Sequence, residues 1–232
     1  IPTGVSTIGS YAFSRCTSLT EMVIPEGVSS IAYGTFYNCT ALGQVTLPGG
    51  LPEIGQEAFQ DCSALEAIEL PEKVTTIGVS TFYGCKMLKQ ITLPDSLTEI
   101  GVQAFQNCSA LEAIKLPDKL TSVGNYAFSG CTALERVDIP ASVAAIGESA
   151  FSGCAKLTAI TFGHRQENPL TIGEEAFYVG YYGENVKTRI GVYSVRGIHP
   201  AIQGYAWEKR TVTYYNTETI PLEAIAIHAQ ND

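Results

Sequence analysis

The sequence has little positive charge and no long apolar run. Its 232 residues include 14 Lys and Arg but 23 Asp and Glu, which gives a formal net charge of -9. Nucleic acids and anionic membranes are bound by clustered basic side chains, so we expect neither to be the main partner. No run of about 18 apolar residues occurs, and we therefore expect no membrane insertion from this fragment.

Motifs for catalysis and for metal binding are also missing. The three histidines, His164, His199 and His228, are far apart, and neither a Gly-x-Ser-x-Gly nor a His-Glu-x-x-His pattern occurs. No Cys-x-x-Cys pair indicates zinc, and no Asp-rich loop indicates calcium. We therefore expect no catalytic residue, no metal and no cofactor, and we expect that the protein is not an enzyme.

What the sequence does contain is a repeat with a period of 23 residues. All seven cysteines follow this step, and seven phenylalanines keep it three residues earlier in each unit. A fixed period of about 20 to 50 residues indicates a repeat array rather than a globular domain. The two columns are Cys16, Cys39, Cys62, Cys85, Cys108, Cys131 and Cys154, and Phe13, Phe36, Phe59, Phe82, Phe105, Phe128 and Phe151.

One unit from the middle of the chain shows the expected local structure. The pattern Leu-x-x-Ile-x-Leu over 111–116 alternates at its end with period two and predicts a short strand, which Pro117 ends. Residues 120–124 predict a second short extended piece that closes at a glycine. Residues 127–131, Ala-Phe-Ser-Gly-Cys, predict a turn or a 3₁₀ turn that points Phe128 and Cys131 inward.

A single unit cannot bury its own apolar side chains, but stacked units can, with neighbouring strands about 4.8 Å apart. We therefore expect the Phe column to form the stabilising spine. We interpret the Cys column as a ladder of buried thiols; disulfides or a metal are the alternatives, and parallel stacked side chains suit a disulfide poorly. Asn38 and Asn107 match the N-glycosylation pattern, but the repeat itself generates both matches, and Asp61 holds the same position.

The regular repeat ends after residue 178. Phe177 follows Phe151 by 26 residues, and we place the three extra residues in a surface loop within 163–169. The next segment is rich in tyrosine and contains the single tryptophan, Trp207, which is typical of a cap over the last open unit. Within it we expect a strand at 189–194, a short helix at 200–209 and a closing strand at 211–215.

The predicted domains are therefore a solenoid over 1–178, an aromatic C-terminal cap over 179–215 and a tail over 216–232. Ile1 and Pro2 already occupy the final positions of a unit, so we expect the sequence to be a fragment whose native start is missing. Its compartment cannot be read from this end.

The repeat resembles the leucine-rich repeats of the BspA-like, or Treponema pallidum, type. The resemblance rests on Leu111-x-x-Ile114-x-Leu116-Pro117, on 120–124 and on 127–131, and it covers about residues 1 to 178. It implies a right-handed, β-rich leucine-rich repeat solenoid with short strands, little helix and a C-terminal αβ cap. It also implies a cell-surface or secreted bacterial or protozoan protein, often one linked to adhesion.

Two candidate surfaces follow from this fold. The strand residues between core positions are expected to face outward on one sheet, a surface that repeat proteins often use for binding. A plain solvated face is the alternative, since no aromatic residue is available there as an anchor. The candidates are Glu21, Gln44, Thr46, Glu69, Gln90, Thr92, Lys115, Arg136 and Asp138. An aromatic patch of the cap, Tyr181, Tyr182 and Trp207, is a second candidate, although such residues more often pack the cap itself.

The function that we expect is a monomeric, non-enzymatic module that binds a protein or a glycan, within a bacterial cell-surface or secreted protein. A different class of function is a structural spacer that holds another domain away from the cell. The sequence does not identify the ligand.

Overall fold

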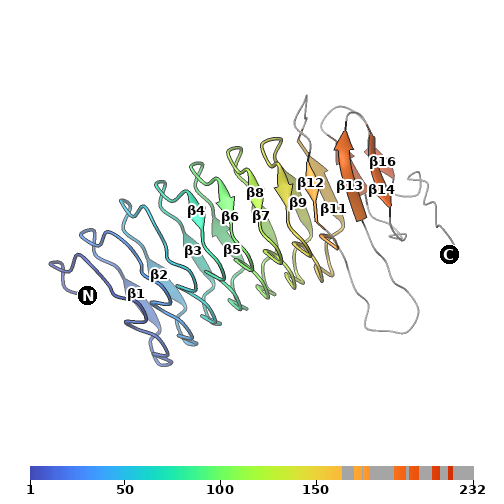
Figure 1. Cartoon of the computed structure of the whole chain (residues 1–232). Coiled ribbons are helices and arrows are strands. Elements are labelled where there is room, and N and C mark those ends of the chain that lie inside the picture. Colours follow the sequence, from blue (N-terminus) through green and yellow to red (C-terminus); the bar gives the residue numbers. More distant parts are fainter. Residues whose placement is uncertain are drawn as a thin grey trace.

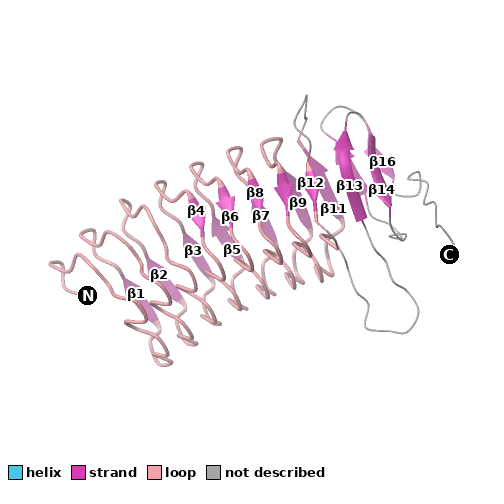
Figure 2. Ribbon diagram, viewed as in Figure 1, coloured by secondary structure: helices cyan, strands magenta, loops and turns pink. Residues whose placement is uncertain are grey.

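The fold follows the 23-residue period along its length. The computed structural model describes residues 1–163, 170–173 and 175–177, together with the backbone of four further strands at 191–196, 199–203, 211–214 and 219–221. Successive units stack as turns of a parallel β-solenoid, which confirms the predicted fold class (Figure 1). The described residues contain strands and turns but no helix (Figure 2).

The first strand of each turn lies on one long side of the solenoid. In the three-residue strands of this row, the central residue points into the core and the flanking residues point outward, as the alternation in sequence predicts. The register pairs equivalent residues of neighbouring units, for example Ala113 with Arg136. These strands are β1 (Glu21–Val23), β2 (Gln44–Thr46), β3 (Ala67–Glu69), β5 (Gln90–Thr92), β7 (Ala113–Lys115), β9 (Arg136–Ile139) and β11 (Ala159–Phe162).

A second row of shorter strands lies on another side. Each strand has two residues and is followed directly by the repeated glycine, as predicted from 120–124. Isolated bridges between Ile8, Ile31 and Ile54 carry the same row into the first units. The strands are β4 (Thr76–Ile77), β6 (Glu99–Ile100), β8 (Ser122–Val123), β10 (Ala145–Ile146) and β12 (Thr171–Ile172).

The third side is made of turns that are hydrogen-bonded both internally and to the next unit. In the unit of Phe128, the amides of Ala127, Ser129 and Cys131 donate to carbonyls three residues earlier, which confirms the predicted turn. The alternate amides of Tyr126, Phe128 and Gly130 instead donate to the next unit, at 2.8, 2.7 and 2.7 Å. This side is therefore as well paired as a sheet.

The core is a stack of identical layers. Phe36, Phe59, Phe82, Phe105, Phe128, Phe151 and Phe177 are fully buried, and successive rings are stacked with centroids 5.0 to 5.5 Å apart. The predicted spine is therefore confirmed. Phe177 stacks on Phe151 at 5.2 Å despite the longer spacing, so the extra residues leave the core unchanged. Residues 164–169, where most of the expected loop falls, lie outside the described residues.

The C-terminal strands extend the sheet. β15 (Thr211–Tyr214) pairs with β11 in parallel, and β16 (Thr219–Pro221) pairs with β15 in antiparallel orientation, so the sheet continues into the stretch that we expected to be a tail. β13 (Gly191–Arg196) and β14 (His199–Gln203) form an antiparallel hairpin. The expected helix at 200–209 is wrong at its start, because 200–203 belong to β14; residues 204–209 lie outside the described part. Within the described residues, no helix is long and apolar enough to cross a membrane.

Candidate interaction surface

The nine strand residues that we singled out lie on the outer face of the first row of strands. Eight of them are exposed and Asp138 is half-buried. Because the strands pair in register, equivalent side chains form straight columns across the face. We call this surface the sheet face, and it consists of Glu21, Gln44, Thr46, Glu69, Gln90, Thr92, Lys115, Arg136 and Asp138 with the small or apolar residues Val23, Ala67 and Ala113 between them.

The sheet face is polar and of mixed charge. Its charged groups are dispersed along the columns, and its apolar members are small, apart from Val23, which is 64% exposed. Large aromatic anchors dominate the binding energy of most protein interfaces, and this face has none. Any binding here would therefore be spread over many modest polar contacts.

One ion pair stiffens the C-terminal end of the face. Arg136 Nη2 lies 2.9 Å from Asp138 Oδ1, and Arg136 Nε also donates to this carboxylate at 2.9 Å. Thr161 donates a further hydrogen bond to Asp138 from the next strand. Burial acts to raise the pKa of Asp138, but the hydrogen bonds from Arg136 and Thr161 outweigh it and hold the pKa below its usual value. Asp138 is therefore fixed as an anion.

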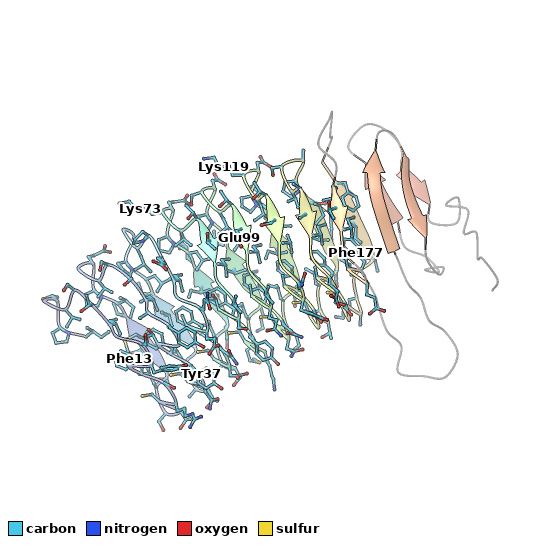
Figure 3. The ribbon with its side chains drawn as sticks, viewed as in Figure 1. Phe13, Tyr37, Lys73, Glu99, Lys119 and Phe177 are labelled. Carbon is cyan, nitrogen blue, oxygen red and sulfur yellow. The ribbon has the colours of Figure 1, made fainter. Side chains whose placement is uncertain are left out.

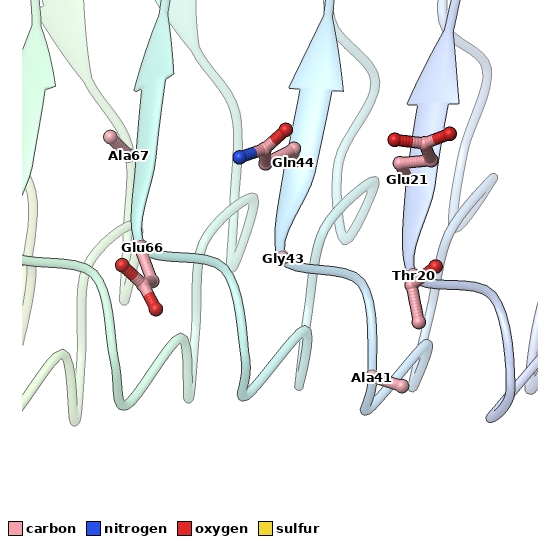
Figure 4. A pocket seen from close by; sticks show the side chains of 7 residues that line it. All are labelled: Thr20, Glu21, Ala41, Gly43, Gln44, Glu66 and Ala67. Carbon is pink, nitrogen blue, oxygen red and sulfur yellow. The ribbon is translucent and has the colours of Figure 1, made fainter.

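A shallow hollow opens on the N-terminal part of the face (Figure 4). Its volume is about 530 Å³. The residues directly before β1, β2 and β3 are Thr20, Gly43 and Glu66, and Gly43 has no side chain to occupy the space between the other two. Ala41 and Ala67 have small side chains as well. The lining residues are Thr20, Glu21, Ala41, Gly43, Gln44, Glu66 and Ala67.

The Cys column is a ladder of buried thiols, as we expected, except at its first member. Cys16 is exposed at the end of the stack and the other six are buried. Each buried thiol donates to the carbonyl of a phenylalanine in the preceding unit, as Cys85 Sγ does to Phe59 O at 3.2 Å. The column thus satisfies buried carbonyls, which is a structural role. Among the described residues, no group of three or more His, Cys, Asp or Glu is placed to hold a metal ion.

The second candidate surface cannot be placed. Tyr181, Tyr182 and Trp207 lie outside the described residues, as do His164 and His228. For His199, the structure describes only the backbone, in β14.

A different aromatic group was missed by the sequence analysis. The Tyr11 ring contacts both the Tyr33 ring and the Tyr37 ring on the turn side of the first two units. Their positions in the sequence could have identified them, because all three lie outside the core columns, in neighbouring units and close to the Phe column. Their spacing is not that of the repeat, and so a search for periodic residues passes over them.

Comparisons with known proteins agree with this geometry. The sequence pattern of the BspA type leucine rich repeat region matches in six copies, over residues 1–112 and 77–196. Among curated proteins, no match to the chain is found.

Solved structures of leucine-rich repeat proteins are similar to the chain. The chain is 34% identical to a leucine-rich repeat protein from Bacteroides ovatus, with a TM-score of 0.59, over 77% of this chain and 51% of that protein. It is 31% identical to the leucine rich repeat protein of T. pallidum, with a TM-score of 0.62, over 68% of this chain and 76% of that protein. A leucine rich cell surface protein from Faecalibacterium prausnitzii is 26% identical, with a TM-score of 0.44, over 70% of this chain and 65% of that protein. The chain spans about half the length of the Bacteroides protein, 51%.

Proposed function

The chain belongs to the BspA type leucine-rich repeat family, and on that basis we propose that it is a non-enzymatic interaction module of a bacterial cell-surface or secreted protein. Its sheet face would present polar side chains to a protein or a glycan. The observation that carries the proposal is the in-register row of exposed strand residues from β1 to β9, backed by a fully buried core.

The physical support is rigidity. Side chains on the sheet face stand on a backbone that is hydrogen-bonded from unit to unit on three sides, so little backbone entropy is lost when a partner binds. Equivalent groups repeat at the strand spacing of about 4.8 Å. Such a face suits an extended partner that makes similar contacts at regular intervals, and adhesion is one use of such binding.

The proposal is tested with a double variant of the sheet face, Gln90→Arg with Lys115→Glu. Both side chains are exposed, so stability should be unchanged within about 0.5 kcal/mol. The unmodified chain is screened on an array of defined glycans and on a panel of purified soluble proteins, and each ligand found is measured again with the variant. We expect binding to fall at least about tenfold, because two central contacts are removed or made repulsive.

The control variant is Thr76→Arg with Lys119→Glu, which makes the same change in charge on another side of the solenoid. Thr76 and Lys119 are exposed, and Lys119 lies along an edge with Lys73 (Figure 3). This variant should bind as well as the unmodified chain. If the two variants lose binding equally, or if only the control loses it, the sheet face is not the binding surface.

The second candidate function is a structural spacer, and one observation favours it: the sheet face has no aromatic anchor in the described residues. A spacer binds no member of either screen, and its rigid length is its only contribution. The screen of the unmodified chain separates the two functions, because the interaction module requires at least one ligand whose affinity depends on Gln90 and Lys115.

A further inference from the structure

Three tyrosines form a cluster on the turn side of the first two units: Tyr11 and Tyr33 are exposed, and Tyr37 is half-buried. The Tyr11 ring meets the Tyr33 ring edge to face, with centroids 5.2 Å apart and planes at 75°, and it meets the Tyr37 ring at 6.4 Å and 79°. Tyr11 is 49% exposed and Tyr33 is 37% exposed. Aromatic side chains of this size are normally buried, so a contact group left open to solvent indicates a binding surface.

The backbone is shaped to hold this cluster. Gly34 has a left-handed backbone conformation, with φ of +56°. The equivalent residues of other units, such as Ser80 and Gln103, have the same conformation but carry side chains. A Cβ atom at Gly34 would lie 2.5 Å from Cε1 of Tyr11, closer than any packing allows. The Tyr11 ring therefore rests directly on the backbone of Gly34. No other described residue at this position of the repeat is glycine.

A carboxylate completes the group. The hydroxyl of Tyr33 donates a hydrogen bond to the Glu57 carboxylate, and this bond is the main reason why the pKa of Tyr33 is raised. The faces of tyrosine rings are electron-rich and attract cations, and the charge of Glu57 adds to that attraction.

The surrounding part of the chain has the same sign of charge. Residues 1–70 contain seven Asp and Glu and a single basic residue, Arg15, so they carry six of the nine net negative charges of the chain. A cationic ligand would be drawn to this end of the solenoid.

We propose that Tyr11, Tyr33, Tyr37 and Glu57 bind a cationic side chain, Lys or Arg, in a basic segment of a partner protein. The edge-to-face arrangement turns ring faces in different directions around a cation, whereas the stacking of a neutral sugar needs a flat platform. The site is separate from the sheet face and stands whether or not that face binds a ligand.

The test uses the full chain and a blocked tri-arginine peptide, with a blocked tri-citrulline peptide as its uncharged analogue. Binding is followed by NMR titration of ring-labelled tyrosines at low salt. We expect the arginine peptide to shift the tyrosine signals and the citrulline peptide to have little effect. Tyr33→Leu and Glu57→Gln should each weaken binding about two- to fivefold, as loss of one exposed cation–π contact or one charge predicts. Added salt should weaken binding further.

Matched variants separate this site from general charge attraction. Tyr83→Leu removes a tyrosine from the same side of the solenoid, two units beyond Tyr37, and Glu99→Gln removes an exposed carboxylate from β6; neither should change the affinity. Arg15→Gln removes the nearby cation and should strengthen binding. Equal binding of the citrulline peptide, equal losses in the matched variants, or binding of maltoheptaose in place of the arginine peptide would each overturn the proposal.

Discussion

At the scale of single residues, the fold depends on side chains that repeat without variation. Each ring from Phe36 to Phe151 lies between two others with nearly parallel planes, at most 10° apart. Each buried Cys contributes a small apolar side chain and a hydrogen bond to a carbonyl of the preceding unit. The first members of both columns lack a preceding layer, so Phe13 is only half-buried and Cys16 is exposed. The same substitution should therefore have different effects at different layers.

Phe82→Ala should lower the free energy of unfolding by about 3–5 kcal/mol, because a fully buried ring between two others leaves a cavity. Phe13→Ala is the matched control and should cost clearly less, since its ring packs on one neighbour only. Urea unfolding measures both. Equal losses for the two variants, or a loss below about 1 kcal/mol for Phe82→Ala, would contradict the buried spine.

Stability should fall as the pH rises above the ordinary pKa of a thiol, about 8.5. Burial, the largest cause, raises the pKa of Cys62, Cys85, Cys108 and Cys131, so these thiols stay protonated in the folded chain and ionise on unfolding. Their contribution is complete below about pH 8.5 and is lost at higher pH, by up to about 1.4 kcal/mol per pH unit for each thiol. Urea unfolding under reducing conditions across this range measures the slope.

Cys85→Ala provides the control for this pH dependence. It should make the alkaline slope shallower by one thiol's share, whereas Cys16→Ala should leave it unchanged because Cys16 is exposed. A slope that is the same in both variants would show that the buried thiols do not cause the alkaline loss of stability.

At the scale of the elements, the turns restrict the choice of residues in each unit through their backbone conformation. Two residues per turn adopt left-handed backbone conformations, with φ of 51° to 58° before the Phe and 57° to 74° after it. From the second to the seventh unit, the second position holds Asn, Asp or Gly, the residues that tolerate this conformation best. This requirement explains why Asn38 and Asn107 match the glycosylation pattern, as the repeat had indicated. At the repeated glycine of several units, namely Gly55, Gly101, Gly124, Gly147 and Gly173, a Cβ atom would lie 2.4 to 2.9 Å from the backbone of the preceding unit.

Gly124→Ala should destabilise the chain by about 1–3 kcal/mol through overpacking. A Cβ atom there would lie 2.6 Å from the carbonyl carbon of Gly101 and 2.7 Å from the amide nitrogen of Val102. Gly49→Ala is the control, since nothing lies within 4 Å of its Cβ position, and it should be neutral or stabilise by up to about 1 kcal/mol. Thermal unfolding of both variants measures the difference. Similar melting temperatures would contradict a close approach of the Gly124 backbone to Gly101 and Val102.

At the scale of the whole molecule, stability comes from contacts between neighbouring units. No unit has a core of its own, and each buries its Phe, Cys and aliphatic residues against the units before and after it. The molecule should therefore tolerate a change in the number of units but not a change in their register.

Deletion of residues 94–116, one complete unit, should leave a chain that folds cooperatively with a modest loss of stability, because Leu93 then joins Pro117 and every column is kept. Deletion of 95–116 removes one residue fewer and shifts all later columns by one position. That shift turns core residues of the following strands outward, so this control should fail to fold or lose several kcal/mol. Circular dichroism and urea unfolding compare the two deletions, and equal stability would refute the register argument.

The sequence by itself determined the repeat, its core columns and the sheet face, because a strict period forces equivalent residues into equivalent environments. Phe82, Cys85 and Gln90 could be assigned to core or surface without coordinates for this reason. The tertiary structure alone decided what breaks the period. It placed Tyr11 on Gly34, exposed Cys16 at the open end and put 200–203 in a strand where a helix was expected. Tyr11 and Gly34 hold equivalent positions of neighbouring units, so their contact depends on residues that differ between units and not on the residues that repeat. The periodic pattern does not specify such contacts.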